Sequence, residues 1–387
     1  MPPTLAPMTM DVSGHDSTAP SVKLWRSCKN MGEDSFRSAG CKTKGKTYKM
    51  ENFTTGPPIG LELRCNMTRS HNFIFTFIPV VYSCNFIIGI VGNSLVVAVI
   101  YFFLKLKTVS NIFVLNLAIS DLTFLLTLPI WAIYTATGYQ WPFGSFLCKA
   151  IGGMALFNLY TSIFLLTALS IDRYLAIVHP VRSRQRRTVV YARVTCVLVW
   201  VVALFLSLPT TVMRRTHFIQ HSNVTVCGIL DKEELRHALA ALSLMKGLLG
   251  FLLPITIIIT CYCLIARALL KAKNIQKNSK SNRDEVLRML TTAVLSFFLC
   301  WAPHQIFNFM SVLITIKVIT SCDVIEVVDT VLPFTICIAF FNSCMNPIVY
   351  SFVGKNFRKS LVKLTKCSSK SVASHPSLST KMSSLSY

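Results

Sequence analysis

An acid and a base stand side by side near the middle of the chain, where Asp172 and Arg173 interrupt the apolar stretch "LTALSIDRYLAIVHP". A carboxylate beside a guanidinium is satisfied in one conformation, and in another the guanidinium is released to a different partner. Asp121 and Lys246 are two more ionisable residues inside apolar runs. Burying a charge without a partner is costly, so each residue indicates a paired or a functional site.

The composition around these residues is typical of a membrane protein. Of 387 residues, 52% are hydrophobic and only 14% are charged, and the mean hydropathy is +0.54. An ordinary soluble enzyme is less apolar. The formal net charge of +23 is distributed between the apolar runs and is not gathered into one block with aromatic residues, which disfavours a nucleic-acid-binding surface.

Seven apolar runs are long enough to cross a hydrocarbon core about 30 Å thick. They cover Phe73–Leu104, Val109–Ala136, Phe146–Val178, Val189–Val212, Ala238–Leu270, Val286–Ile316 and Val324–Val353. We therefore predict an all-α membrane protein, built as a seven-transmembrane helix bundle. Prolines inside the runs predict kinks, which let a bundle enclose a cavity. They are Pro129, Pro209, Pro254, Pro303, Pro333 and Pro347.

The distribution of Lys and Arg predicts the orientation. The short loops "LKLKT", "VRSRQRR", "KAKNIQKNSKSNR" and "GKNFRKSLVKLTK" are basic and recur on the same side of successive spans, which indicates the cytoplasm. An odd number of spans then places the N-terminus outside the cell and the C-terminus inside. Three glycosylation sequons, at Asn52, Asn66 and Asn223, fall on the same outer side. The N-terminal segment is itself basic, but long segments translocate largely regardless of charge.

Composition divides the chain into three parts. Residues 1–70 are predicted to be an extracellular segment, and they contain no apolar core of a cleavable signal. Within it, residues 1–49 are interpreted as a flexible polar extension before an alternative start at Met50. Residues 71–353 form the transmembrane domain, and residues 354–387 form a cytoplasmic tail.

Several intramembrane polar residues allow two interpretations each. Asp121 fits a cation or switch site, or else a carboxylate held for packing by neighbouring Asn and Ser. Lys246 either binds an anionic ligand group or snorkels to the interface. His304 and Gln305 either act at a site or are hydrogen-bonding core residues.

The cysteines separate by compartment. Seven of the fourteen lie inside the spans, where a small buried side chain is the ordinary role. Four others lie on the oxidising outer face and allow two disulfides: Cys65, Cys148, Cys227 and Cys322.

Five motifs, one for each of five helices and in the expected order, resemble those of rhodopsin-like (class A) G-protein-coupled receptors: "GNSLVVAVI", "NLAISDL", "SIDRYLAIVHP", "CWAPHQ" and "NSCMNPIVYSF". Longer stretches, among them "IVHPVRSRQRRT", are similar to the angiotensin-receptor branch, from about His71 into the tail. The resemblance implies a plasma-membrane receptor for an angiotensin II-like peptide that signals through heterotrimeric G proteins, of the Gq class, to phospholipase C and calcium. Receptors of the type-2 angiotensin, bradykinin or apelin kind are the alternatives.

The same resemblance assigns the residues that couple to the G protein. Arg173 belongs to an Asp-Arg-Tyr motif, in which the arginine turns toward the G protein on activation. A helix that rises about 1.5 Å per residue places Asp172 roughly 36 Å from Cys148, at the cytoplasmic mouth. The matching switch residues are Asp172, Arg173, Tyr174, Trp301, Asn346, Pro347 and Tyr350.

Asp121 matches the family's allosteric sodium position, and sodium is the one cofactor that the resemblance implies. Its candidate neighbours are Asn93, Asn158, Ser162 and Asn342. In the angiotensin-receptor branch the residue at the place of Asn158 is held in the resting state by a helix-seven asparagine, but here that position is Ser343. A serine hydroxyl is shorter than a carboxamide, which predicts a weaker resting state.

The resemblance also implies the outer contacts. It pairs Cys148 with Cys227, and Cys65 with Cys322. Lys246 would meet the carboxylate at the C-terminus of the hormone, with Arg214 bracing the peptide. The cleft would be lined by Tyr82, Trp131, Tyr134, Tyr160 and Ile336.

The chain departs from the family at one position that would face the other end of the peptide. Asp329 would meet a basic residue of the hormone. In the family a second acid, on helix six, shares this role, but Ser311 occupies its position here. The identity and the affinity of the peptide are therefore open.

The tail predicts contacts inside the cell. Phe357, Leu361 and Leu364 recur at helical spacing among basic residues, which predicts a short amphipathic eighth helix on the lipids of the inner leaflet; a merely solvated basic tail is the alternative. Cys367 is a candidate for palmitoylation. The Ser-rich end is expected to be disordered and suits receptor kinases and arrestin.

Three other classes are disfavoured. A retinal protein needs a Schiff-base lysine in its last span, and Val324–Val353 contains none. A secondary transporter would show repeated halves with interrupted helices, and no such repeat is found. No catalytic constellation is present in the sequence, so the chain is not expected to be an enzyme.

Overall fold

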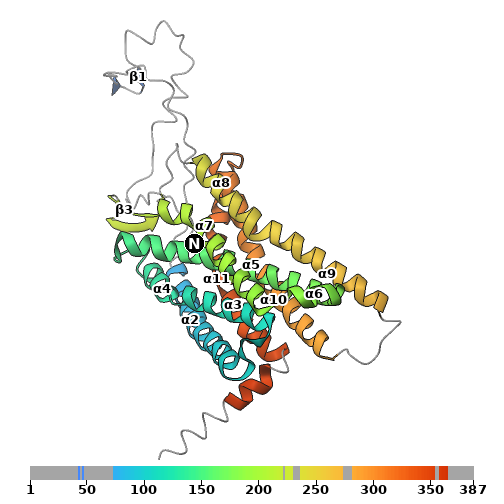
Figure 1. Ribbon diagram of the computed structural model, residues 1–387. Coiled ribbons are helices and arrows are strands. Elements are labelled where there is room, and N and C mark those ends of the chain that lie inside the picture. Colours follow the sequence, from blue (N-terminus) through green and yellow to red (C-terminus); the bar gives the residue numbers. More distant parts are fainter. Residues whose placement is uncertain are drawn as a thin grey trace, which may run out of the picture. The chain divides into compact units, whose positions relative to one another are not determined.

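The computed structural model describes residues 42–43, 46–47, 73–220, 223–229, 236–272, 281–353 and 357–364. Within these ranges seven helical segments are long and apolar enough to cross a membrane, which confirms the predicted seven-helix bundle (Figure 1). Two short strands, β1 (Lys42–Thr43) and β2 (Lys46–Thr47), pair antiparallel and belong to a unit separate from the helices.

The predicted spans agree with the observed helices to within a few residues at most ends. The spans are Ile74–Leu104, Val109–Ala136, Gly144–Val178, Val189–Met213, Arg236–Lys271, Leu287–Thr315 and Cys322–Phe352. Their α-helices are α2 (Ile74–Val99), α3 (Val109–Leu125), α4 (Leu128–Ala136), α5 (Gly144–Val178), α7 (Val189–Met213), α8 (Arg236–Gly247), α9 (Leu253–Ala272), α10 (Ser281–Thr315) and α11 (Cys322–Val353).

Helix α5 is the central helix of the bundle. It packs against α3, α7, α9 and α10, and α10 in turn packs along α11. Most of α5 is buried, whereas α7 leaves large apolar side chains such as Val197 and Phe205 exposed on its outer face. Apolar side chains on the outside of a bundle are expected where lipid is the solvent.

Short elements connect the spans. On the predicted cytoplasmic side these are a 3-10 turn at Lys105–Lys107 and the helix α6 (Pro180–Arg186), which the sequence had indicated only as a basic loop. Between α7 and α8, β3 (Arg215–Ile219) and β4 (Val224–Gly228) form an antiparallel hairpin. Residues 357–364 are helical, in agreement with the predicted eighth helix.

Proline affects the helices unequally. The second span is broken into α3 and α4, because Pro129 lacks the N–H that would continue the hydrogen-bond ladder. In the fifth span α9 follows α8 (Figure 1), and a π-helix, η5 (Leu248–Leu252), lies between them just before Pro254. Helices α10 and α11 continue through Pro303 and Pro333 without a break.

The first and last spans approach closely at Gly92. A Cβ atom added to Gly92 would lie 2.9 Å from Cβ of Pro347, closer than side chains normally pack. The proline ring cannot rotate away, so the two helices would have to separate.

We expect Gly92→Ala to destabilise the bundle by about 1–3 kcal/mol, the usual effect of overpacking a tight contact. The measurement is thermal unfolding of the purified protein in detergent. Gly247→Ala is the matched control, because Gly247 is also helical but has nothing within 4 Å of an added Cβ. Equal melting temperatures for the two variants would contradict the predicted close contact.

Candidate functional site

The C-terminal end of α5 contains a three-residue ion cluster. Nη2 and Nε of Arg173 donate to Oδ2 of Asp172 at 2.6 and 3.1 Å, and Nη2 also donates to the Ser110 hydroxyl on α3. Arg187, at the junction of α6 and α7, donates from Nε and Nη2 to the two oxygens of Asp172 at 2.6 and 2.9 Å. The predicted acid–base pair is therefore present, together with a second guanidinium that the sequence did not single out.

Tyr174, the third residue of the predicted motif, makes a separate contact. Its hydroxyl lies 3.2 Å from Nε2 of His179, at the end of α5, and the two rings meet edge to face. The contact closes the last turn of α5 before α6 begins.

A polar network occupies the middle of the bundle around Asp121, whose side chain is fully buried. Asn158 on α5 donates to Oδ1 of Asp121 at 3.2 Å, and Asn346 on α11 donates to Oδ2 at 2.9 Å. Asn158 also donates to the hydroxyl of Ser120 at 3.1 Å. A carboxylate that joins three helices agrees with both interpretations of Asp121, as a switch site and as a packing element.

Ser343 joins this network only weakly. Its hydroxyl lies 3.5 Å from Oδ1 of Asn158, at the long limit of a hydrogen bond. Its backbone carbonyl accepts a shorter bond, 2.9 Å, from the carboxamide of Asn93 on α2. Ser343 thus binds α2 firmly through its backbone and α5 weakly through its side chain.

Three proposed sodium neighbours have unused acceptor atoms. Within the described chain, Oδ1 of Asn93, Oγ of Ser162 and Oδ1 of Asn342 are buried without a hydrogen-bond partner. Buried oxygen atoms without a donor suit a cation, which accepts lone pairs and brings no proton. These residues therefore fit a small cation, although both oxygens of Asp121 already accept hydrogen bonds from amides.

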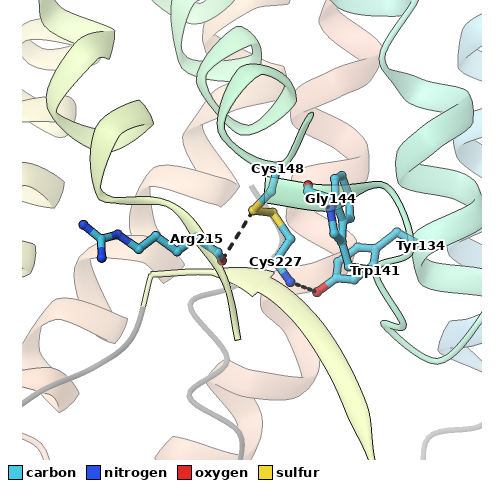
Figure 2. Close-up of a disulfide and its surroundings, with 6 residues drawn as sticks. All are labelled: Tyr134, Trp141, Gly144, Cys148, Arg215 and Cys227. Carbon is cyan, nitrogen blue, oxygen red and sulfur yellow. Dashed lines mark hydrogen bonds between the residues drawn. A yellow bond between two sulfur atoms is a disulfide. The ribbon is translucent and has the colours of Figure 1, made fainter. Parts of the chain in front are cut away.

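The disulfide Cys148–Cys227 is formed, as predicted, and joins α5 to β4. Figure 2 shows it between the Arg215 carbonyl, 3.5 Å from Sγ of Cys148, and the Tyr134 ring, whose hydroxyl accepts from the Cys227 amide at 3.2 Å. Nε1 of Trp141 donates to the Gly144 carbonyl at 2.8 Å beside them. The bridge fixes the hairpin over the ends of α4 and α5.

Two cationic side chains, Arg214 and Lys246, are buried at the end of the bundle that carries the β3–β4 hairpin. Arg214 follows α7 directly, and two of its nitrogen atoms, Nε and Nη1, have no partner among the described residues. Burial lowers the pKa of Arg214 to about 10, so the guanidinium stays charged at neutral pH. Nζ of Lys246 on α8 donates to Oδ1 of Asn308 on α10 at 2.8 Å. Lys246 is buried, which disfavours the alternative that it snorkels to the interface.

Most of the proposed cleft residues lie in one buried cluster. Tyr82, Trp131, Tyr134 and Ile336 share it with the disulfide, whereas Tyr160 belongs to the larger cluster further along the bundle and stacks on Phe164. Asp329 and Ser311 are partly buried on α11 and α10. The structure thus groups the aromatic residues and leaves their contact with a peptide as a prediction.

The remaining switch residues lie along α10 and α11. The indole N–H of Trp301 and the hydroxyl of Tyr350 are buried without a partner among the described residues. Nδ1 of His304 makes a long contact, 3.4 Å, with the hydroxyl of Thr335 inside the core, while Nε2 of Gln305 has no hydrogen-bond partner in the described chain. His304 therefore agrees with the interpretation as a core residue.

Several sequence predictions concern residues outside the described ranges. Asn52, Asn66, Cys65 and Cys367 are not described. Cys322 is disulfide-bonded, and its predicted pairing with Cys65 stays a prediction because Cys65 lies outside the described residues. Asn223 is exposed, at the turn of the β3–β4 hairpin, where its sequon is accessible.

Three polar residues of these sites were missed by the sequence interpretation: Ser110, Arg187 and Asn308. Asn308 does carry a signal, because it follows His304 by one helical turn and so shares its face of α10. Arg187 is one of four arginines in its loop, and nothing in the sequence distinguishes it from the others.

Comparison with known proteins gives consistent matches. The family described as "7 transmembrane receptor (rhodopsin family)" matches residues 92–350. The chain is 53% identical over 323 residues to the type-1 angiotensin II receptor B of Mus musculus, covering 84% of this chain and 90% of that receptor. It is 52% identical to the type-1 angiotensin II receptor of Sus scrofa with the same coverage, and 53% identical over 327 residues to that of Gallus gallus, covering 84% and 91%. These relatives are receptors, which confirms the prediction that the chain is not an enzyme.

The long contact of Ser343 leads to a prediction about resting activity. Ser343→Asn should restore a full hydrogen bond to Asn158, worth about 1 kcal/mol, and so lower signalling in the absence of agonist. Ser343→Ala, the matched control, should change resting activity little, because it removes only a weak bond. The measurement is agonist-free inositol phosphate production at equal surface expression, and the idea fails if Ser343→Asn signals like the unmodified chain.

Proposed function

Because this chain belongs to the rhodopsin family of seven-transmembrane receptors, we propose that it is a receptor for an angiotensin II-like peptide hormone. The observation that carries the proposal is an identity of 52–53% to proteins named type-1 angiotensin II receptors, over about nine-tenths of their length. The chain is thus a multi-pass plasma-membrane protein whose kinds of partner are a peptide and a heterotrimeric G protein.

The buried cations support a peptide with an anionic terminus. Arg214 is charged, and two of its nitrogen atoms have no partner within the described chain. Lys246 donates to Asn308, whose amide oxygen is neutral, so this contact does not neutralise the ammonium. We infer that the C-terminal carboxylate of the hormone binds Lys246 and that Arg214 braces the peptide.

Signalling is proposed to run through Gq proteins to phospholipase C and calcium. The Asp172–Arg173 pair supports a switch, because a partner that binds Arg173 must compete with a buried carboxylate. An allosteric sodium ion held by Asp121, Ser162 and Asn342 belongs to the same proposal, and the ion would supply a positive charge to the buried carboxylate. The unused oxygens of Ser162 and Asn342 support it.

The orientation and the modifications follow from the sequence. The N-terminus is proposed to be extracellular, with glycans on Asn52, Asn66 and Asn223, and the C-terminus cytoplasmic. The disulfide at Cys148 supports this, since disulfides form on the oxidising side. Palmitoylation at Cys367, phosphorylation by receptor kinases and capture by arrestin complete the proposal.

A different peptide is the second candidate, and Ser311 favours it. This serine stands on α10 where receptors of the angiotensin branch are expected to have an acid. A hormone with a weaker basic group at the corresponding position would lose less binding free energy from the change to serine. The alternatives are receptors of the bradykinin or apelin kind, which take other peptides, and receptors of the type-2 angiotensin kind.

Competition binding tests the ligand directly. Cells that express the chain should bind labelled angiotensin II, and unlabelled angiotensin II should displace it better than bradykinin or apelin. Replacing the C-terminal carboxylate of the hormone by an amide should weaken binding about ten-fold or more, the value of one charge-assisted hydrogen bond of about 1.5–3 kcal/mol.

The role of Lys246 is tested in the same assay. The Lys246→Ala variant should bind the amidated hormone and the unmodified hormone equally weakly, because the ammonium that distinguishes an amide from a carboxylate is gone. Lys359→Ala, an exposed lysine of the eighth helix, is the control and should keep the full difference. A preserved preference for the free acid in Lys246→Ala would refute the proposed contact.

Ser311 and Asp329 give a prediction for the other end of the peptide. Ser311→Asp should tighten angiotensin II by restoring a charge-assisted contact, whereas Ser311→Asn, similar in shape but uncharged, should not. Asp329→Ala should weaken binding more than Glu326→Ala one turn earlier on α11. Dissociation constants from saturation binding measure these effects. An equal effect of Ser311→Asp and Ser311→Asn would show that a negative charge at position 311 on α10 is dispensable.

A further inference from the structure

The carboxylate of Asp172 is shared unequally between its two arginines. Arg187 donates to both oxygens, at 2.6 and 2.9 Å, which is the two-pronged geometry that suits a guanidinium best. Arg173 reaches Oδ2 alone. The Asp172 side chain is only 1% exposed, while Arg173 and Arg187 are 16% and 24% exposed. The stronger pair is therefore the one that the proposed switch motif does not contain.

Arg187 is held in place by its own backbone. Its N–H donates to the Ser183 carbonyl at 2.9 Å, which ends α6, and the next residue, Thr188, caps α7 by accepting from the Tyr191 amide at 3.1 Å. The guanidinium thus projects from the junction of two helices, and α7 itself packs along α5. Such a group stays beside Asp172 when another partner leaves.

The shared pairing of Asp172 affects how easily Arg173 can leave this carboxylate. If Asp172 had Arg173 as its single partner, a turn of Arg173 toward the cytoplasm would leave a buried carboxylate unpaired, which strongly opposes the movement. With Arg187 in place, the carboxylate keeps a two-pronged partner. In addition, two like charges on one carboxylate repel each other, which further favours the release of Arg173.

We propose that Arg187 is the standing counter-ion of Asp172, which keeps this carboxylate paired while Arg173 turns to the G protein and so favours the coupling-competent state. This inference rests on the proposed function, because it assumes a G protein as the partner of Arg173. It adds a positioning residue, outside the Asp-Arg-Tyr motif, that sets the balance between the resting and the coupling state.

Charge-removing variants of Arg187 test the proposal. Arg187→Gln and Arg187→Ala should lower nucleotide exchange on the G protein, both without agonist and with angiotensin II, and should raise the agonist concentration for half-maximal exchange by roughly five-fold or more. Arg187→Lys should retain part of the nucleotide exchange, since lysine keeps the positive charge but cannot donate to both carboxylate oxygens as a guanidinium does. Arg182→Ala, an exposed arginine of the same loop, is the control and should behave as the unmodified chain.

A double-mutant cycle separates this role from a purely structural one. In an Asp172→Asn background there is no buried charge to pair, so Arg187→Gln should have no further effect on exchange at equal surface expression. An equal loss in both backgrounds would overturn the proposal, as would a rise in agonist-free exchange on Arg187→Gln alone, which would make Arg187 a lock of the resting state.

The experiments distinguish a wrong ligand assignment from a wrong role for Arg187. If angiotensin II does not stimulate the unmodified chain, the ligand assignment is wrong. The comparison of Arg187→Gln with Arg182→Ala in agonist-free exchange is still decisive for Arg187, because it needs no hormone.

Discussion

The carboxylate of Asp121 accepts a hydrogen bond from each of two helices, and the arrangement of the bundle depends on this pairing. Asn158 brings α5 and Asn346 brings α11 to the same side chain on α3. In a medium without water, a fully buried carboxylate must have such donors, so the three helices cannot slide or turn independently. The network reaches α2 as well, through the bond from Asn93 to the backbone of Ser343.

The sequence predicts those parts of the fold that the membrane imposes. A hydrocarbon core requires about 20 apolar residues per helix, so the number, order and approximate ends of the spans could be predicted. The local winding could not. Pro129 breaks its helix, whereas Pro303 lies in a continuous one, because neighbouring helices decide whether the freed backbone groups are satisfied. The hairpin of β3 and β4 is likewise fixed by a disulfide, not by a strong strand pattern.

The candidate site was predictable where its partners are adjacent or recur in a family motif. Asp172 and Arg173 are neighbours in the sequence, and their pairing needs no knowledge of the fold. Arg187 and Asn308 are different, because each meets its partner only through the path of the chain. The turn at the end of α6 selects one arginine from a basic loop, and the packing of α8 on α10 brings an amide to Lys246. Side-chain type alone carries no information on such selections.

The two ends of α5 differ in the sign of their buried charge. One end has a buried acid with two basic partners, and the other lies near buried basic side chains. At the end of α5 beside α6, one carboxylate has two guanidinium partners, so in the proposed switch the group that leaves is a cation and the acid that stays is still paired. On the hairpin side the buried groups are cations, and Arg214 has nitrogen atoms without a partner in the described chain, so an anionic ligand group would add a bond there. A ligand shifts an equilibrium only by its differential affinity for the two states. Helix α5 carries both Asn158 and the Asp172–Arg173 pair, so a single helix connects the Asp121 network to the ion cluster beside α6.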